Sequence, residues 1–456
     1  MRNILIIGAG RSASSLIKYL LNKSESENLK LTIADLSLEL AQKKTNNHPN
    51  ATPIQLDIAN VDHRQKEVGK ADIIISMLPA HLHLEIAEDC LAFNKHMVTA
   101  SYISPKMQEL DEQAKEKGLV FMNEIGLDPG IDHMSAMKII DEIRAKGGKM
   151  IQFESFCGGL VAPESDTNLW NYKFSWNPRN VVLAGQGGVS KFIQEGKYKY
   201  IPYNKLFRRT EFMEVEGYGR FEGYANRDSL KYRSIYGLDD ILTMYRGTLR
   251  RVGYSKAWDM LVQLGMTDDS YPMENSEHMS YRDFTNSFLA YHPTDSVELK
   301  LRHYLKIDQD DVIWDKFVEL DLFDGTQKAG IKNASPAQYL EHILAQKWAL
   351  QPEDKDMIVM YHKFGYELEG KKKQIDSTMV CLGEDQTYTA MAKTVGLPVA
   401  IATLQILNGN ITTPGVQLPI KKEVYEPILK ELESFGVIFT DKEVPYMGYN
   451  PNNVGS

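Results

Sequence analysis

The chain has 456 residues, of which 43% are hydrophobic and 25% are charged, and its formal net charge is −9. This length predicts two or three domains, and the composition is typical of a globular protein in water. The acidic balance argues against a nucleic-acid partner, and we find no run of about 18 apolar residues that would predict a membrane span.

The three cysteines, Cys90, Cys157 and Cys381, are far apart and odd in number. They have neither the pattern of a disulfide framework nor metal-ligand spacing, so we expect no metal site and a reducing, cytoplasmic location. The apolar run ILIIG at 4–8 is too short for a signal peptide and predicts a strand.

The first 125 residues alternate short apolar runs with amphipathic, helix-like stretches. This alternation predicts a buried parallel sheet with helices on both faces, and therefore an N-terminal Rossmann domain of the α/β class. The six predicted strands cover residues 4–8, 31–35, 51–57, 71–79, 96–101 and 119–124.

The pattern changes after Asp128. A helix is predicted over 132–148, strand-like runs with glycine and aromatic residues over 149–255, mostly helical sequence over 256–350, and a long apolar helix over 389–409. These features predict a mixed α/β domain with a helical insertion.

The sequence GAGRSA follows the first predicted strand and opens a helix. Gly8 and Gly10 permit a tight turn and the close approach of a pyrophosphate, and the small Ala13 lets helix and strand pack. The phosphates would lie at the helix N-terminus, which favours anions. This segment therefore predicts dinucleotide binding.

Asp35 ends the second predicted strand, and its carboxylate could accept hydrogen bonds from the ribose hydroxyls of NAD. No Arg or Lys occurs in residues 35–42 to bind the 2′-phosphate of NADP. We therefore expect NAD to be preferred, with NADP possible; the alternative is that Asp35 caps the next helix.

Polar residues also end the later strands: Ser76 with Pro79, Ser101 with Tyr102, and Asp128 in NEIGLDPGIDH. Each could form an ordinary turn, and Asp-Pro-Gly in particular suits a β-turn. Because ligands of parallel sheets bind beyond the carboxyl ends of the strands, the three together favour a site that includes Asp128.

Other polar residues are less informative. His81, His83 and His133 are expected at the surface or in caps. Local basic residues are either solvated surface charges or clamps for substrate carboxylates: Arg208, Arg209, Arg227, Arg246, Arg250 and Arg251.

At this point the chain resembles the glutamate-forming saccharopine dehydrogenases, also called saccharopine reductases. The resemblance rests on segments that run in order along nearly the whole chain: GAGRSA, SYISPKMQELD, MNEIGLDPGIDH, CGGLVAPES, YKFSWNPR, NRDS, RGTLRR and GLPVAIATLQILNG. One departure is that some relatives carry a basic Arg-Thr pair after the second strand, where this chain has Asp35-Leu36-Ser37.

The resemblance implies a Rossmann domain at 1–130, a substrate domain at 131–388 with a helical insertion at about 256–350, and a C-terminal segment, 389–456, that packs back on the first domain. It implies the interconversion of saccharopine with L-glutamate and 2-aminoadipate 6-semialdehyde by a nicotinamide cofactor, in lysine metabolism. We also expect a homodimer.

Site residues carried over from the resemblance fall into two sets. Cofactor contacts are implied for Gly10, Arg11, Ser12, Ala13, Asp35, Asp57, Ser76, Met77, Leu78, Ser101, Leu127, Asp128, Pro129, Gly130, Ile131 and Ser175. Substrate contacts are implied for Ser101, Tyr102, Asp128, Arg227, Thr248, Leu249 and Arg250.

The mechanistic hypothesis is hydride transfer between the nicotinamide and the carbon of a C–N bond, with the protein orienting the groups and moving protons. Asp128, Tyr102 and Cys157 are the candidate catalytic residues, although Cys157 could instead be a packed core thiol. Two alternatives remain: a carboxynorspermidine-type dehydrogenase, and a non-catalytic NAD-binding redox sensor.

Overall fold

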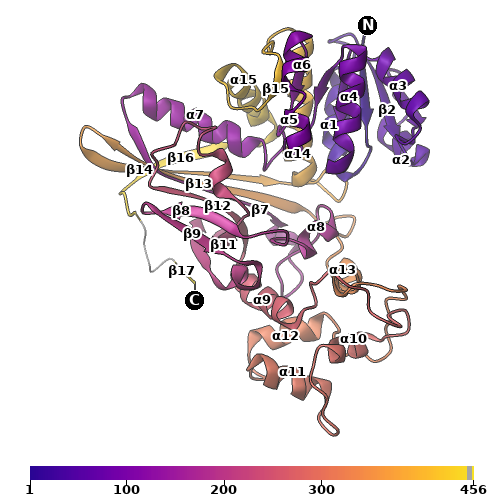
Figure 1. The fold of residues 1–456 in the computed structure, drawn as a ribbon, viewed down its shortest axis with the longest axis vertical. Helices are drawn as coiled ribbons and strands as arrows, with labels where there is room; N and C mark the ends of the chain where they lie inside the picture. Colours follow the sequence, from indigo (N-terminus) through magenta and orange to yellow (C-terminus); the bar gives the residue numbers. More distant parts are fainter. Residues whose placement is uncertain (449–453, 456) are drawn as a thin grey trace. The chain divides into compact units, whose positions relative to one another are not determined.

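The computed structural model describes residues 1–448 and 454–455 (Figure 1), and it divides the chain into two compact units. Unit 1 consists of Met1–Lys149 and Met379–Asp441, and unit 2 of Met150–Thr378 and Lys442–Ser456. The sequence had suggested boundaries near 130 and 388. The last part of the predicted segment 389–456, residues 449–453 and 456, lies outside the described residues.

Unit 1 contains a seven-stranded sheet in the order β15-β6-β5-β4-β1-β2-β3, in which every adjacent pair is parallel. The chain reverses direction across the sheet between β1 and β4, where ligands of this fold bind. The six predicted strands are present, and β15 adds a seventh. Their bounds are β1 Arg2–Ile7, β2 Leu29–Asp35, β3 Ala51–Gln55, β4 Ile73–Ser76, β5 His96–Val98, β6 Val120–Met122 and β15 Gly415–Gln417.

The central strand β1 is buried on both faces, since Ile4, Leu5, Ile6 and Ile7 are each at most 1% exposed. Helices must therefore cover both sides of the sheet. They are α1 Ser14–Lys23, α2 Leu38–Thr45, α3 Val61–Lys70, α4 His83–Phe93, α5 Pro105–Gln108, α6 Asp111–Glu116, α7 Ile131–Ala145, α14 Ala390–Leu407 and α15 Lys422–Leu432, with the 3-10 turns η1 Arg11–Ala13, η2 Ala80–Leu82 and η6 Glu433–Phe435.

Helix α14, which matches the long apolar helix predicted over 389–409, is the one described helix that is long and apolar enough to cross a membrane, although the sequence had suggested no membrane span. However, 72% of its most apolar window is buried inside the structure. It contacts α1, α15, β4 and β5, and a Cβ at Gly396 would lie only 2.8 Å from the carbonyl oxygen of Ser12. Its apolar surface is therefore used in the core of unit 1.

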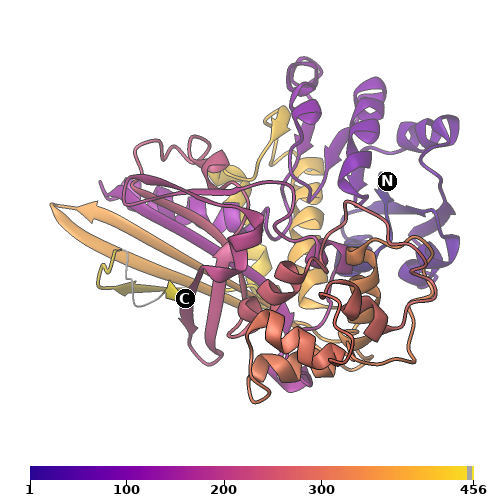
Figure 2. The ribbon, with the colours of Figure 1, turned by 60° about the horizontal axis from the view of Figure 1, so that its bottom comes forward.

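Unit 2 is built on a mixed sheet in the order β16-β14-β13-β7-β12-β11-β10-β17, with the β8–β9 hairpin joined to β12. Figures 1 and 2 both show the long strands β13 and β14 side by side. The strands are β7 Lys149–Val161, β8 Ser190–Gln194, β9 Lys197–Ile201, β10 Thr210–Val215, β11 Gly219–Ala225, β12 Thr243–Arg251, β13 Asp356–Leu368, β14 Lys371–Leu382, β16 Phe439–Val444 and β17 Val454–Gly455.

The predicted helical insertion is present, and its core is aromatic: Trp170, Trp258 and Trp348 are each at most 1% exposed and pack against one another. Ser residues cap several of its helices, which satisfies N–H groups of the first turn. The helices of unit 2 are α8 Pro178–Val182, α9 Tyr254–Leu264, α10 Tyr281–Ser287, α11 Val297–Leu305, α12 Val312–Glu319 and α13 Pro336–Lys347, with η3 Pro163–Ser165, η4 Tyr203–Arg208 and η5 Ser229–Tyr232.

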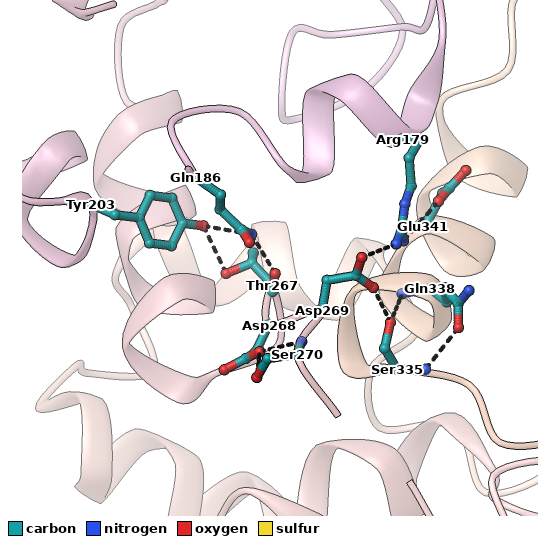
Figure 3. A network of polar contacts seen from close by, with 10 residues as sticks. All are labelled: Arg179, Gln186, Tyr203, Thr267, Asp268, Asp269, Ser270, Ser335, Gln338 and Glu341. Carbon is teal, nitrogen blue, oxygen red and sulfur yellow. Dashed lines mark hydrogen bonds and ion pairs between the residues drawn. The ribbon is translucent and has the colours of Figure 1, made fainter. Parts of the chain in front are cut away.

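A polar network joins this insertion to the segment before it (Figure 3). Arg179, at the start of α8, lies between Asp269 and Glu341 and forms ion pairs with both. Ser335, which caps α13, also donates to Asp269. The network therefore fixes the end of the predicted YKFSWNPR motif against α13.

The two faces of β12 differ in character. Arg246, Thr248 and Arg250 alternate along the strand and share one face with Cys157, the register partner of Thr248 on β7.

The fold class is confirmed: a Rossmann unit is followed by a mixed α/β unit with a helical insertion.

The other face of this sheet buries a cluster of charges. Glu154 lies 3.1 Å from Lys363, and burial together with the nearby Glu154 carboxylate raises the pKa of Glu211 to about 7. The Glu211 Oε1 atom is buried and has no hydrogen-bond partner in the structure. This cluster lies on the face opposite to Arg250.

Candidate active site

The loop after β1 is tightly packed on one side and open on the other. Gly8 has a φ of +106°, and a Cβ there would lie 2.8 Å from the carbonyl oxygen of Met77 at the end of β4. No atom lies within 4 Å of where the Cβ of Gly10 would be. The first turn of η1 begins directly after Gly10, so the N–H groups of Arg11 and Ser12 lack intrahelical acceptors, whereas that of Ala13 donates to the carbonyl of Gly10. The loop that carries Gly8, Gly10, Arg11, Ser12 and Ala13 fits a pyrophosphate.

Asp35 ends β2 and is held by the backbone of unit 1. Its two oxygens accept hydrogen bonds from the N–H groups of Ala9, at 2.7 Å, and Ser37, at 2.9 Å. Ser37, not Asp35, caps α2. Asp57 follows β3, is exposed, and accepts a hydrogen bond from the N–H of Ala59.

A buried histidine joins the ends of β4 and β5. His83 Nδ1 lies 2.8 Å from Ser76 Oγ, and His83 Nε2 lies 2.7 Å from Ser101 Oγ. His83 is 4% exposed, and burial followed by the charge of His81 lowers its pKa to about 4. The side chain of Ser76 is buried, so of the two hydroxyls only that of Ser101, which is half-buried, is open to a ligand.

Tyr102 and Asp128 come together at the same edge of the sheet. The Tyr102 hydroxyl donates a hydrogen bond to Asp128 Oδ1 over 3.3 Å. Both side chains are half-buried. A carboxylate next to a phenol is an arrangement that can accept and hold a proton from a bound substrate.

The loop of Asp128 closes tightly on itself. The N–H of Gly126 donates to the carbonyl of Pro129, and a Cβ at Gly130 would lie 2.1 Å from the carbonyl oxygen of Gly126. The turn itself therefore requires Gly130, whose φ is +145°, and the close approach of Ala100 favours glycine at 126, where a Cβ would lie 2.9 Å from the Cβ of Ala100. The segment forms a turn and also holds Asp128 next to Tyr102, while the predicted Leu127, Pro129 and Ile131 are buried around it.

Glu124 connects the Asp128 loop to the segments around it. Its Oε1 accepts from the N–H of Ile103, and its Oε2 lies 2.9 Å from His133 Nε2 on α7. Glu124 and His133 are both at most 1% exposed. The carboxylate thus connects the residue after Tyr102, the end of β6 and the helix that follows Asp128.

In unit 2, Arg250 is a buried cation surrounded by aromatic rings. Its guanidinium lies 4.9 Å from the ring centroid of Tyr172, 5.3 Å from that of Tyr254 and 5.9 Å from that of Tyr224. The guanidinium donates to the carbonyl of Leu249 and forms a side-chain hydrogen bond with Tyr254, but Nε has no hydrogen-bond partner among the described residues. Among the ion pairs of the described residues, none joins Arg250 to a carboxylate. Such a buried cation is suited to receive an anionic group from a ligand.

The other predicted residues of unit 2 have varied surroundings. Thr248 is half-buried and forms a side-chain hydrogen bond with Tyr224 on the face of Arg250, whereas Leu249 points into the core. Cys157 is buried beside Thr248 on the same face. Arg227 is exposed, with a φ of +48°. Ser175 is buried, and its hydroxyl has no hydrogen-bond partner in the part of the chain that the structure describes.

The surroundings of three polar residues, His83, His133 and Glu124, were not identified from the sequence. His81, His83 and His133 were expected at the surface or in caps; a surface position is wrong for His83 and His133, which are both buried, whereas His81 is exposed. Glu124 was quoted within a motif but was given no role. Its φ of +52°, unusual for a residue other than glycine, is visible only in the structure. No group of His, Cys, Asp or Glu among the described residues could hold a metal ion.

Known proteins resemble this chain over almost its whole length. Family models described as "Saccharopine dehydrogenase NADP binding domain" and "Saccharopine dehydrogenase C-terminal domain" match residues 4–122 and 126–437. The saccharopine dehydrogenase [NADP(+), L-glutamate-forming] of Schizosaccharomyces pombe is 34% identical, covering 96% of this chain and 98% of its own.

Similar values hold for the protein of the same name from Saccharomyces cerevisiae, which is 33% identical over 97% of this chain and 99% of its own. A solved structure of the apo, histidine-tagged saccharopine dehydrogenase (L-Glu forming) from that yeast superposes with a TM-score of 0.84. It is 32% identical and covers 97% of this chain and 100% of its own.

The expected preference for NAD is wrong. Both relatives carry NADP(+) in their names, and the family model over 4–122 is described as NADP binding. The expectation rested on Asp35, whose carboxylate is accounted for by the N–H groups of Ala9 and Ser37. Because the carboxylate at the end of β2 has this structural role, its presence does not indicate whether NAD or NADP is bound.

The resemblance drawn from the sequence motifs is therefore confirmed by the family models, by the relatives and by the superposition. The glycine loop, the Tyr102–Asp128 pair and the caged Arg250 all lie in segments that these matches cover. The chain belongs to the saccharopine dehydrogenase family.

Proposed function

We propose that this chain is an NADP-dependent, L-glutamate-forming saccharopine dehydrogenase, an oxidoreductase that acts on a CH–NH bond. It interconverts saccharopine, NADP+ and water with L-glutamate, 2-aminoadipate 6-semialdehyde and NADPH: loss of the hydride and of the nitrogen proton gives an imine, and water hydrolyses its C–N bond. Relatives with that name cover nearly its full length. The single observation in the molecule that carries the proposal is Arg250, a buried guanidinium with no carboxylate partner among the described residues.

The loop of unit 1 supplies the cofactor site in this proposal. The open space beside Gly10 and the N–H groups at the start of η1 would hold the pyrophosphate. NADP+ held at this loop would accept the hydride that leaves the carbon of the substrate C–N bond. Ser101 and the backbone of Met77 and Leu78, at the ends of β5 and β4, orient the cofactor.

Asp128 and Tyr102 handle the proton of the substrate nitrogen. The Asp128 carboxylate accepts this proton, and the Tyr102 hydroxyl, 3.3 Å from Oδ1, stabilises the carboxylate before the proton arrives. The Glu124 contacts with Ile103 and His133 keep the two loops in register. Cys157 stays a second candidate for proton transfer, since it shares the face of β7 and β12 with Thr248.

Substrate carboxylates are the ligands of the basic residues in unit 2. Arg250 offers a planar donor fork in a dry, aromatic environment, where charge-assisted hydrogen bonds are strong. Thr248 adds a hydroxyl on the same face, and the exposed Arg227 is suited to a second carboxylate. A substrate with several carboxylates matches these groups better than an amine substrate with few.

Steady-state assays on the purified protein test the proposal. Saccharopine and a carboxynorspermidine-type amine are each supplied with NADP, and the absorbance of the reduced nicotinamide is followed. We expect turnover with saccharopine alone. Turnover with the second amine and not with saccharopine would reject the assignment. No turnover with either would favour a non-catalytic, cofactor-binding protein over an enzyme.

A further inference from the structure

Two hydrogen bonds connect Ser76 to Ser101 through the ring of His83, across the ends of two neighbouring strands. Ser76 ends β4, His83 begins α4, and Ser101 follows β5. The two contacts measure 2.8 Å at Nδ1 and 2.7 Å at Nε2. Both ring nitrogens of a histidine that is 96% buried are therefore used by hydroxyls.

The imidazole is neutral near physiological pH, because burial lowers the pKa of His83 to about 4. A neutral ring has one N–H donor and one acceptor nitrogen, so one serine donates to the ring and the other accepts from it. The ring hydrogen is either on Nδ1 or on Nε2. In the first case Ser101 donates its hydrogen to the ring, and in the second case Ser101 keeps its hydrogen for a ligand.

The burial of the two serines decides between these two cases. Among the described residues, His83 Nδ1 is the only hydrogen-bond partner of the Ser76 hydroxyl, which is 1% exposed. If Nδ1 carried the hydrogen, the Ser76 O–H would be buried without an acceptor, which costs about 1–3 kcal/mol. If Nε2 carries it, Ser76 donates to Nδ1, and the half-buried Ser101 accepts from Nε2.

We propose that His83 is a positioning residue that fixes the Ser101 hydroxyl as a hydrogen-bond donor to a ligand oxygen. Because the Ser101 oxygen already accepts from Nε2, its own proton points away from the ring. It suits a carbonyl or carboxylate oxygen, which is present both in the carboxamide of the cofactor and in the substrate. The inference rests on the proposed function only for the identity of that ligand.

A double-mutant cycle tests the proposal. His83→Leu, Ser101→Ala and the double variant are compared for saccharopine KM, for kcat and for the Kd of NADPH. We expect each single variant to raise KM or Kd by about 10- to 100-fold, the range of one hydrogen bond to a charged or strongly polar group. The double variant should be no worse than Ser101→Ala, since His83 acts through Ser101.

The affected quantity identifies the ligand. A change in saccharopine KM alone assigns the acceptor to a substrate carboxylate, and a change in the Kd of NADPH alone assigns it to the cofactor. His83→Gln keeps an N–H donor near the position of Nε2 and should recover most of the loss, whereas the exposed His81→Leu is a matched control with no effect. Additive losses in the double variant would overturn the proposal.

A measurement on the unaltered protein does not depend on the folding of variants or on turnover. In protein labelled with ¹⁵N-histidine, the His83 signals are assigned by their absence in His83→Gln. We expect a protonated Nε2 and an unprotonated Nδ1 that do not change between about pH 5.5 and 8. A protonated Nδ1 would overturn the proposal, while failure of saccharopine turnover would reject the proposed function and leave this result standing.

Discussion

Replacing Arg250 with methionine separates substrate binding from folding. The guanidinium is enclosed by Tyr172, Tyr224 and Tyr254 and forms no ion pair with the described carboxylates. A hydrogen bond to a charged group is worth about 1.5–3 kcal/mol, and a guanidinium that binds a carboxylate through two N–H groups makes two. The loss of about 3–6 kcal/mol corresponds to a saccharopine KM that is higher by about 10²–10⁴-fold.

The stability of the protein without ligands should change much less. Methionine raises the free energy of unfolding because a lone cation is no longer buried. The loss of the cation–π contacts, about 0.5–2 kcal/mol each, lowers it. We therefore expect the free energy of unfolding in urea to stay within about 2 kcal/mol of that of the unaltered protein.

Arg251→Met is the matched control. Arg251 is the next residue of β12 and points to the other face, where it lies 4.3 Å from the ring centroid of Phe221 and donates to the carbonyl of Tyr218. Its replacement should leave saccharopine KM unchanged. An unchanged KM in Arg250→Met, together with a large loss of stability, would refute the assignment of Arg250 to a substrate carboxylate.

Three further substitutions test other parts of the account. Asp128→Asn should lower kcat/KM by about 10²–10⁴-fold with little change in the Kd of NADPH; near-normal turnover would make Asp128 a turn residue only. Glu211 has a pKa of about 7, above its usual 4.5, so the protein should lose stability as the pH rises between these values. Glu211→Gln should flatten that slope in urea titrations and stabilise the protein at pH 8 by up to about 3 kcal/mol, and an unaltered slope would contradict the burial argument. Glu124→Gln removes an anionic acceptor from Ile103 and His133 and should lower the free energy of unfolding by about 1–3 kcal/mol, which an unchanged urea midpoint would disprove.

The sequence predicts the strands of unit 1 well, because strands buried on both faces must be apolar throughout. Ile4–Ile7 is an example, since the run is buried on both faces of the sheet. Strand β15 was not predicted in this way. It has only three residues, and its place beside β6 depends on tertiary contacts such as that of the Val416 N–H with Asp111.

The candidate site shows the same limit. The glycine loop and the Asp128 segment stand out because glycine and proline constrain the backbone locally. His83 and Glu124 do not, since their hydrogen-bond partners lie 7 to 21 residues away in the sequence: Ser76 and Ser101 for His83, and Ile103 and His133 for Glu124. Asp35 was misread because its acceptor role toward Ala9 cannot be seen before the loop is folded.

Product stoichiometry with saccharopine and NADP tests the central claim most directly. The purified protein is incubated with both, NADPH is followed by absorbance, and L-glutamate and 2-aminoadipate 6-semialdehyde are quantified by mass spectrometry. The account predicts one glutamate and one semialdehyde for each NADPH formed. NADPH without glutamate, or no NADPH at all with saccharopine, would contradict it.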